Sequence, residues 1–237
     1  MWLNSGFLFV DSSTISSGVD NVGTVSASLV TYASIQALQP DLVINAGTAG
    51  GFKDLCTPTI MPKFGSKIVL QQDARCFQAK GACVGDVFLA TDVAFHDRRI
   101  PIPVFDQYGI GLRKACSAPN LLKELNLKIG ALSTGDSLDM SPHDESSILA
   151  NGATVKDMEQ ASPLLISKFG FQGAAVAYVA DLLKVPVIFI KAVTDIVDGE
   201  KPTAEEFLQN LAAVTAALDQ SVTKVVDFIN GKCISEL

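Results

Sequence analysis

The stretch Val185–Gly199, which reads V-P-V-I-F-I-K-A-V-T-D-I-V-D-G, constrains the fold of this chain more than any other. Val187–Ile190 form a continuous apolar run without polar alternation. Such a run predicts a strand that is buried on both faces, as in a parallel sheet covered by helices. The run then breaks into Lys191, Thr194 and Asp195, and ligands of open α/β sheets bind beyond the carboxyl ends of the strands. Asp195 is therefore a candidate proton donor or ligand contact, and a carboxylate that caps the next turn is the alternative.

The composition excludes several classes of function. The chain has 237 residues, of which 48% are hydrophobic and 18% charged, and this favours one large α/β domain with a full core. The net charge of −7 argues against binding to nucleic acid, and we expect neither a signal peptide nor a membrane span. Five cysteines without CxxC spacing are typical of reduced thiols in a cytoplasmic protein. Only two histidines are present, so we expect no zinc site.

Strand patterns alternate with helix patterns along the chain. We predict helices over residues 20–39, 121–125, 146–150 and 173–184, and strands over 41–51, 85–93, 127–133 and 153–155. Thr203–Glu206 reads as a capping box that opens a final helix ending before Gly231. A proline-interrupted loop runs through Phe105 and Tyr108, and residues 54–78 read as a long loop with one short strand, Lys67–Leu70. This alternation predicts a three-layer α/β fold in a single domain over residues 1–237.

Five ordered motifs carry a resemblance to a known family. They are Gly18–Gly23, Asn45–Gly51, Ser133–Asp136, Asp157–Glu159 and Thr194–Asp195. They occur in the order seen in the purine nucleoside phosphorylase/uridine phosphorylase family. Within this family the chain resembles the plant-type 5′-methylthioadenosine nucleosidases, to which the segments 95–103 and 195–207 look close. Five motifs in order are far more specific than any one of them.

The resemblance implies both a fold and a reaction. The fold is a three-layer α/β/α nucleoside phosphorylase-like domain with a central mixed sheet. The reaction is hydrolysis of the N-glycosidic bond of 5′-methylthioadenosine to adenine and methylthioribose, in methionine salvage, and S-adenosylhomocysteine is left open as a second substrate. The resemblance also implies a homodimer and a reaction that needs no cofactor. The chemistry requires a proton for the adenine leaving group, a grip on the ribose and an activated water.

The family's site residues map onto positions of this chain. The proton donor matches Asp195, whose apolar neighbours Val193 and Ile196 are expected to raise its pKa. The ribose-binding pair matches Met158 and Glu159, and a carboxylate that accepts hydrogen bonds from vicinal hydroxyls binds more strongly as positive charge develops on the sugar. The other matches are Thr48 near the ribose and water, Lys156 and Asp157 as contacts or shapers of that strand end, Ser137, Leu138 and Asp139 alongside adenine, and Lys191 at a position that is often basic.

Simpler readings stay open for several of these residues. Glu159 would also serve as a carboxylate at the start of a helix, and Thr48 as an ordinary turn residue. The resemblance places His96 and Asp97 near the dimer interface and the alkylthio pocket, with Phe105 and Tyr108 as pocket candidates.

Three segments depart from the family pattern, namely residues 1–17, 54–78 and 160–172. The first stands where the family has its first strand and its water-activating glutamate. We therefore expect the sheet to lack that strand and the activity to be impaired. The other two fall at the boundaries of motifs, since residues 160–172 separate Glu159 from Gly173, and we hypothesise that both are unspliced sequence.

Two other functions remain as alternatives. A phosphorylase of the same fold would need a basic phosphate site, for which Arg75, Arg98, Arg99 and Arg113 are the available arginines. A non-catalytic protein that binds nucleosides or dimerises with an intact nucleosidase would not need the water-activating glutamate.

Overall fold

Strand β6 (Val187–Ile196) lies in the core of the sheet, and all ten of its residues are buried. In the computed structural model, which describes residues 23–53, 81–100, 102–137, 140–157, 172–200 and 202–237, β6 lies between two other strands. It pairs in parallel with β1 (Val43–Gly51) and antiparallel with β2 (Val87–Phe95). The prediction of a strand buried on both faces is confirmed. The strand also extends beyond the apolar run, so Asp195 belongs to the strand itself.

The sheet curls into a ring. The strand order is β3-β2-β4-β5-β1-β6, and β6 also pairs with β2. This additional pairing closes the five longer strands, from β2 to β6 in that order, into a ring. The remaining strands are β3 (Arg113–Lys114), β4 (Lys128–Thr134) and β5 (Ala153–Asp157). Parallel and antiparallel pairings both occur, as expected for a mixed sheet. The closure of the ring was not among the predictions from the sequence.

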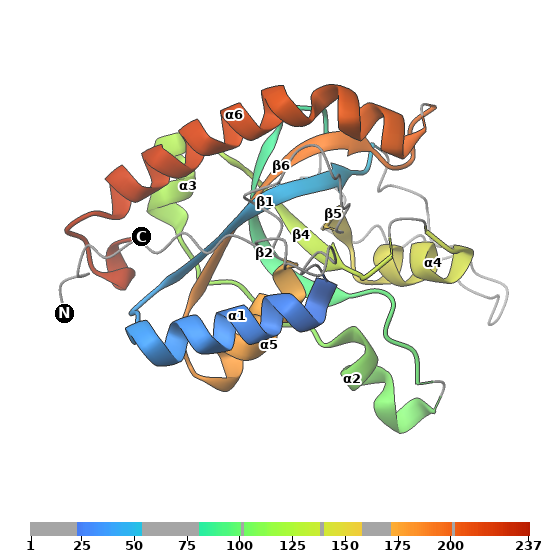
Figure 1. Cartoon of the computed structure of the whole chain (residues 1–237), viewed down its shortest axis with the longest axis horizontal. Coiled ribbons are helices and arrows are strands. Elements are labelled where there is room, and N and C mark those ends of the chain that lie inside the picture. The colour runs from blue at the N-terminus through green and yellow to red at the C-terminus, as the bar shows by residue number, and fades with distance from the viewer. Residues whose placement is uncertain (1–22, 54–80, 101, 138–139, 158–171, 201) are drawn as a thin grey trace, which may run out of the picture.

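Helices cover the sheet on opposite sides, as Figure 1 shows. On one side α6 (Thr203–Ile229) and α3 (Pro119–Leu125) pack against Ile188 and Ile190 of β6. On the other side α5 (Gly173–Leu182) packs against Phe189 and Val193, and α1 (Gly23–Leu38) lies beside α5. The other helical elements are α4 (Pro142–Ala150), α2 (Asp106–Ile110) and the 3₁₀ turns Pro103–Phe105 and Ile234–Glu236. The described residues thus form the expected α/β/α layers.

Several local predictions need correction. Helix α6 begins at Thr203 without a capping box, because the Glu206 carboxylate accepts a hydrogen bond from the Ile196 N–H at 2.7 Å instead. Helix α4 begins at Pro142, since Ser141 and Asp144 form a capping box there. The loop through Phe105 and Tyr108 contains a 3₁₀ turn and α2.

The segments that depart from the family pattern fall largely outside the description. Residues 1–17, 54–78 and 160–171 lie outside the described residues, and with them the expected loss of a first strand and the predicted strand Lys67–Leu70. In the part of the chain that is described, every helix is too short or too polar to cross a membrane.

Candidate active site

Asp195 lies near the carboxyl end of β6 with only 3% of its surface exposed. The Thr194 hydroxyl donates a hydrogen bond to its Oδ1 atom at 2.8 Å. Burial raises the pKa of the Asp195 carboxyl above the ordinary value of 3.8, and the hydrogen bond from Thr194 partly opposes this shift. The negative charge of Glu206 raises the same pKa further. A carboxyl that retains its proton to higher pH is suited to act as a general acid.

Gly50 of β1 gives the Asp195 carboxyl its space. Gly50 is the strand partner of Asp195 on one side and of Lys156, from β5, on the other. A Cβ atom on Gly50 would lie 2.9 Å from Asp195 Oδ2 and 2.6 Å from Val197 Cγ2. Glycine is therefore needed for the close approach of the carboxyl to β1. The buried Lys156 also lies close enough for its charge to lower the pKa of Asp195.

A second cluster centres on Asp157 at the end of β5. Its Oδ2 atom lies 2.8 Å from Lys191 Nζ and accepts a hydrogen bond from the Gly173 N–H at 2.7 Å. Its Oδ1 atom accepts a hydrogen bond from the Thr134 hydroxyl at 2.6 Å. The side chains of Asp157 and Lys191 are both almost completely buried. The cluster therefore joins β4, β5 and β6 to the start of α5.

A third group of side chains lies at the end of β4. His96 is buried, and its Nδ1 atom is 3.0 Å from the Ser133 hydroxyl. Burial lowers the pKa of His96 to about 4, so the ring is neutral at physiological pH. Asp97 accepts a hydrogen bond from the Asp136 N–H at 2.6 Å. The resemblance implied a place for both residues near the dimer interface and the alkylthio pocket, and no local pattern in the sequence indicated their contacts with the end of β4.

The structure brings together most of the predicted site residues that it describes. Thr48, Lys156, Asp157, Lys191 and Asp195 lie on the adjoining strands β5, β1 and β6, and Ser137 follows β4. Thr48 pairs with Ala192, three positions before Asp195. The predicted residues Leu138, Asp139, Met158 and Glu159 lie outside the described residues. Within the described ranges, side chains that could ligate a metal form no group of three or more.

Phe105 and Tyr108, the pocket candidates, lie on the 3₁₀ turn and on α2, and both are exposed. Arg98 connects Tyr108 to the end of β2, because its guanidinium carbon lies 5.5 Å from the centre of the Tyr108 ring and 3.4 Å from that of the Phe95 ring.

The chain is similar to known proteins over most of its length. A family model described as the phosphorylase superfamily matches residues 9–227. The chain is 62% identical over 220 residues to a 5′-methylthioadenosine/S-adenosylhomocysteine nucleosidase of Arabidopsis thaliana, covering 93% of this chain and 72% of that protein. It is also 62% identical to a 5′-methylthioadenosine nucleosidase of the same plant, with coverage of 93% and 68%.

Solved structures agree with this likeness. The apo structure of Arabidopsis thaliana 5′-methylthioadenosine nucleosidase matches with a TM-score of 0.75 and 61% identity, over 93% of this chain and 75% of that one. The resemblance inferred from the five motifs is therefore confirmed. The chain belongs to the phosphorylase superfamily and, within it, to the family of the plant 5′-methylthioadenosine nucleosidases.

Proposed function

We propose that this chain hydrolyses the N-glycosidic bond of 5′-methylthioadenosine to adenine and methylthioribose, as a step of methionine salvage. S-adenosylhomocysteine is the second candidate substrate. The observation that carries the proposal is the buried Asp195 carboxyl, with its raised pKa and its hydrogen bond from Thr194, in a chain 62% identical to plant nucleosidases. Protonation of adenine makes the base a better leaving group, and this is the task of a general acid.

The roles of the site residues follow from this reaction. Asp195 donates its proton to N7 of adenine, and because Thr194 engages Oδ1, we assign Oδ2 to the base. Glu159 and Met158 hold the ribose, with Thr48 beside the sugar and the attacking water. Ser137 and Leu138 line the base. Lys156, whose charge lies near Asp195, and the Asp157–Lys191 pair support the strand ends that carry these groups.

The described arginines favour hydrolysis over phosphorolysis. A phosphorylase needs cations that are free to bind phosphate. The Arg98 guanidinium lies 3.4 Å from the centre of the Phe95 ring, Arg99 pairs with Asp144, and Arg113 pairs with Asp181 at 3.4 Å. Each of the three arginines within the described ranges is thus already engaged by the protein.

Release of adenine from 5′-methylthioadenosine by the purified chain tests the proposal. The assay is run with and without phosphate, beside the variant Asp195→Asn, which keeps the shape of the side chain and removes the acid. We expect release that does not depend on phosphate and falls about 10²–10⁴-fold in the variant. Release that requires phosphate would establish a phosphorylase, and adenine binding without release would establish a non-catalytic binding protein.

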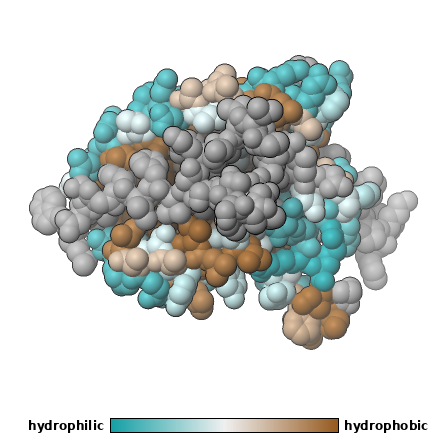
Figure 2. All heavy atoms as spheres, in the orientation of Figure 1, coloured by the Kyte–Doolittle hydropathy of each residue, from teal (hydrophilic) through white to brown (hydrophobic). Residues whose placement is uncertain are grey.

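We also propose that the chain forms a homodimer through α1 and its surroundings. Val25, Leu29 and Tyr32 of α1 are more than half exposed, and Leu182 of the adjoining α5 is 65% exposed. Figure 2 shows apolar surface over α1 and α2. Exposed apolar surface of this kind is typical of protein interfaces. Light scattering is expected to give the mass of a dimer for the chain and of a monomer for Leu29→Glu. A monomeric parent chain would refute the proposal.

A further inference from the structure

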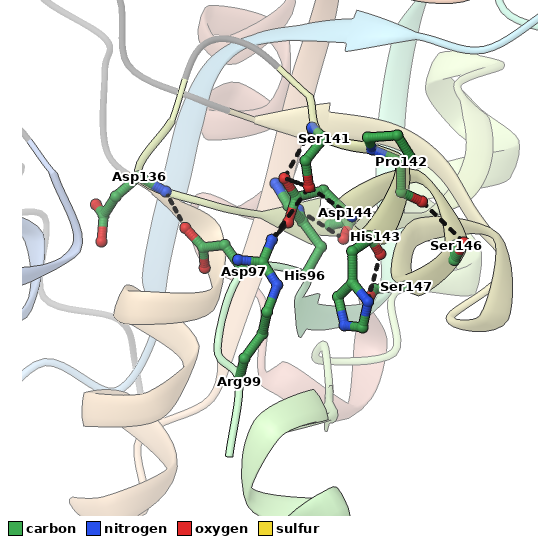
Figure 3. A network of polar contacts seen from close by, with 11 residues as sticks. His96, Asp97, Arg99, Asp136, Ser141, Pro142, His143, Asp144, Ser146 and Ser147 are labelled. Atoms are coloured by element: carbon green, nitrogen blue, oxygen red, sulfur yellow. Dashed lines mark hydrogen bonds and ion pairs between the residues drawn. The ribbon is translucent and has the colours of Figure 1, made fainter. Parts of the chain in front are cut away.

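The segment from His96 to Arg99 holds two sides of the turn that follows β4, as Figure 3 shows. On one side Asp97 Oδ2 accepts a hydrogen bond from the Asp136 N–H at 2.6 Å. On the other side Arg99 forms an ion pair with Asp144, and its terminal nitrogen lies 3.4 Å from the Ser141 hydroxyl. Since Ser141 and Asp144 cap α4, Arg99 braces the start of that helix.

The Asp136 side chain is held as firmly as its main chain. Its Oδ1 atom accepts a hydrogen bond from the Thr24 N–H at 2.7 Å, and its Oδ2 atom accepts one from the Thr24 hydroxyl, also at 2.7 Å. The first turn of α1, which is fully described, has no acidic residue of its own, so Asp136 supplies the negative charge that a helix N-terminus favours. Asp136 is thus fixed by α1 through its carboxylate and by Asp97 through its amide.

His96 fixes the residues just before Asp136. The main-chain N–H of His96 donates a hydrogen bond to the Thr134 carbonyl at 3.1 Å, and the imidazole ring lies beside the Ser133 hydroxyl. The ring also packs on Gly135, where a Cβ atom would come within 2.3 Å of His96 Nε2 and 3.0 Å of Asp97 Oδ2. His96 and Asp97, the two residues that follow β2, therefore contact each residue from Ser133 to Asp136 at the end of β4.

We propose that Asp97 is a positioning residue for the proposed nucleosidase reaction. By holding the Asp136 amide, Asp97 positions the next residue, Ser137, against the adenine base. The inference rests on the proposed function, because Ser137 is assigned to the base there. Asp97 does not touch the substrate, and its effect is confined to the place of the residue that follows Asp136. A displacement of about 1 Å in a substrate-positioning group is enough to weaken its contribution strongly. Loss of Asp97 is therefore expected to weaken the binding of the base and to spare the binding of the sugar.

Calorimetric titration with adenine and, separately, with methylthioribose tests this inference. In Asp97→Ala we expect an adenine Kd about tenfold higher than in the parent chain, which corresponds to one hydrogen bond to a charged group. The Kd for methylthioribose is expected to stay unchanged. Asp97→Asn retains a side-chain oxygen that can accept from the Asp136 N–H, so it should restore most of the adenine affinity. Asp106→Ala, an exposed aspartate of α2, serves as the matched control.

The outcomes separate the inference from the proposed function. Failure of the parent chain to bind adenine would refute the proposed function and this inference together. Binding by the parent chain with an undiminished adenine affinity in Asp97→Ala would refute the inference alone. An equal loss of affinity for adenine and for methylthioribose, unrestored in Asp97→Asn, would show that Asp97 supports the fold as a whole and would also overturn it.

Discussion

Lys191 Nζ lies 2.8 Å from Asp157 Oδ2, and both side chains are withdrawn from solvent between the sheet and the start of α5. Replacement of both partners of a buried ion pair by apolar groups often changes stability little, but loss of one partner leaves an uncompensated buried charge and is strongly destabilising. The hydrogen bonds from Thr134 and Gly173 complete the surroundings of the carboxylate. The pair therefore fixes the strand end from which Met158 and Glu159 follow.

Replacement of Lys191 by methionine is expected to destabilise the chain strongly. The substitution keeps the apolar stem and removes the charge, so Asp157 is left buried without its cation. We expect the free energy of unfolding to fall by about 3–5 kcal/mol, measured by chemical denaturation. Lys184→Met is the matched control, because Lys184 pairs with Asp181 at the surface, where such a pair contributes about 1 kcal/mol or less. Equal losses in the two variants would contradict the assignment of a structural role to the buried pair.

Asp195→Asn is expected to change the dependence of stability on pH. The folded pKa of Asp195 is raised above 3.8, so its contribution to stability is fully present below that pH and is lost as pH rises through the folded pKa. The asparagine variant should therefore match the parent chain near pH 3.5 and exceed it in unfolding free energy at pH 8. Denaturation at several pH values measures the difference. Asp219→Asn, at an exposed position of α6, controls for the loss of one negative charge. A difference in unfolding free energy between Asp195→Asn and the parent chain that does not vary with pH would contradict the raised pKa.

Glu206→Gln is expected to move the pH profile of adenine release. The negative charge of Glu206 raises the pKa of Asp195, and its carboxylate also accepts the hydrogen bond from Ile196. Glutamine keeps an oxygen for that hydrogen bond and removes the charge. The loss of activity on the alkaline side should therefore begin at lower pH than in the parent chain. Glu205→Gln, an exposed neighbour, should leave the profile unchanged. A shift to higher pH in Glu206→Gln would show that the coupling has the opposite sign.

Local patterns were sufficient to predict much of the fold. The apolar run Val187–Ile190 predicted the central strand, and the helical spacing of residues 20–39 predicted α1, which the structure places at Gly23–Leu38. The closure of the ring between β2 and β6 could not be predicted, because that pairing joins residues about one hundred positions apart and leaves no local signal. Glu206 was misread for a similar reason, since its partner, Ile196, comes from another element of the fold.

In the candidate site too, local positions could be predicted from the sequence and contacts between distant elements could not. The position of Asp195 near the end of a buried strand could be predicted from the apolar run Val187–Ile190 that precedes it, whereas its role was implied by the family resemblance alone. The partners of those groups could not be placed, since Asp157 meets Lys191 and Asp97 meets Asp136 only after the strands have assembled. Sequence spacing gives no measure of such contacts.

Gly50→Ala is expected to impair activity through Asp195. The added Cβ atom would meet Val197 Cγ2 at 2.6 Å and Asp195 Oδ2 at 2.9 Å, so both side chains have to move. Overpacking of this kind costs about 1–3 kcal/mol of unfolding free energy. The double variant Gly50→Ala/Val197→Ala relieves only the contact with Val197. It should recover part of the stability while adenine release stays low, and full recovery of both would show that Asp195 is not displaced.

His96→Asn is expected to reduce the fall in unfolding free energy that the chain shows at acidic pH. Because burial holds the pKa of His96 at about 4, the unfolded chain binds a proton below pH 6.5 that the folded chain does not bind. The unfolding free energy of the parent chain should therefore fall between pH 6.5 and 4, with a contribution from His96 on the order of 3 kcal/mol. Asparagine can replace His96 Nδ1 beside the Ser133 hydroxyl but does not titrate in this range. The stability of the variant relative to the parent should rise as pH falls. Parallel curves for the two proteins would mean that folding does not lower the pKa of His96.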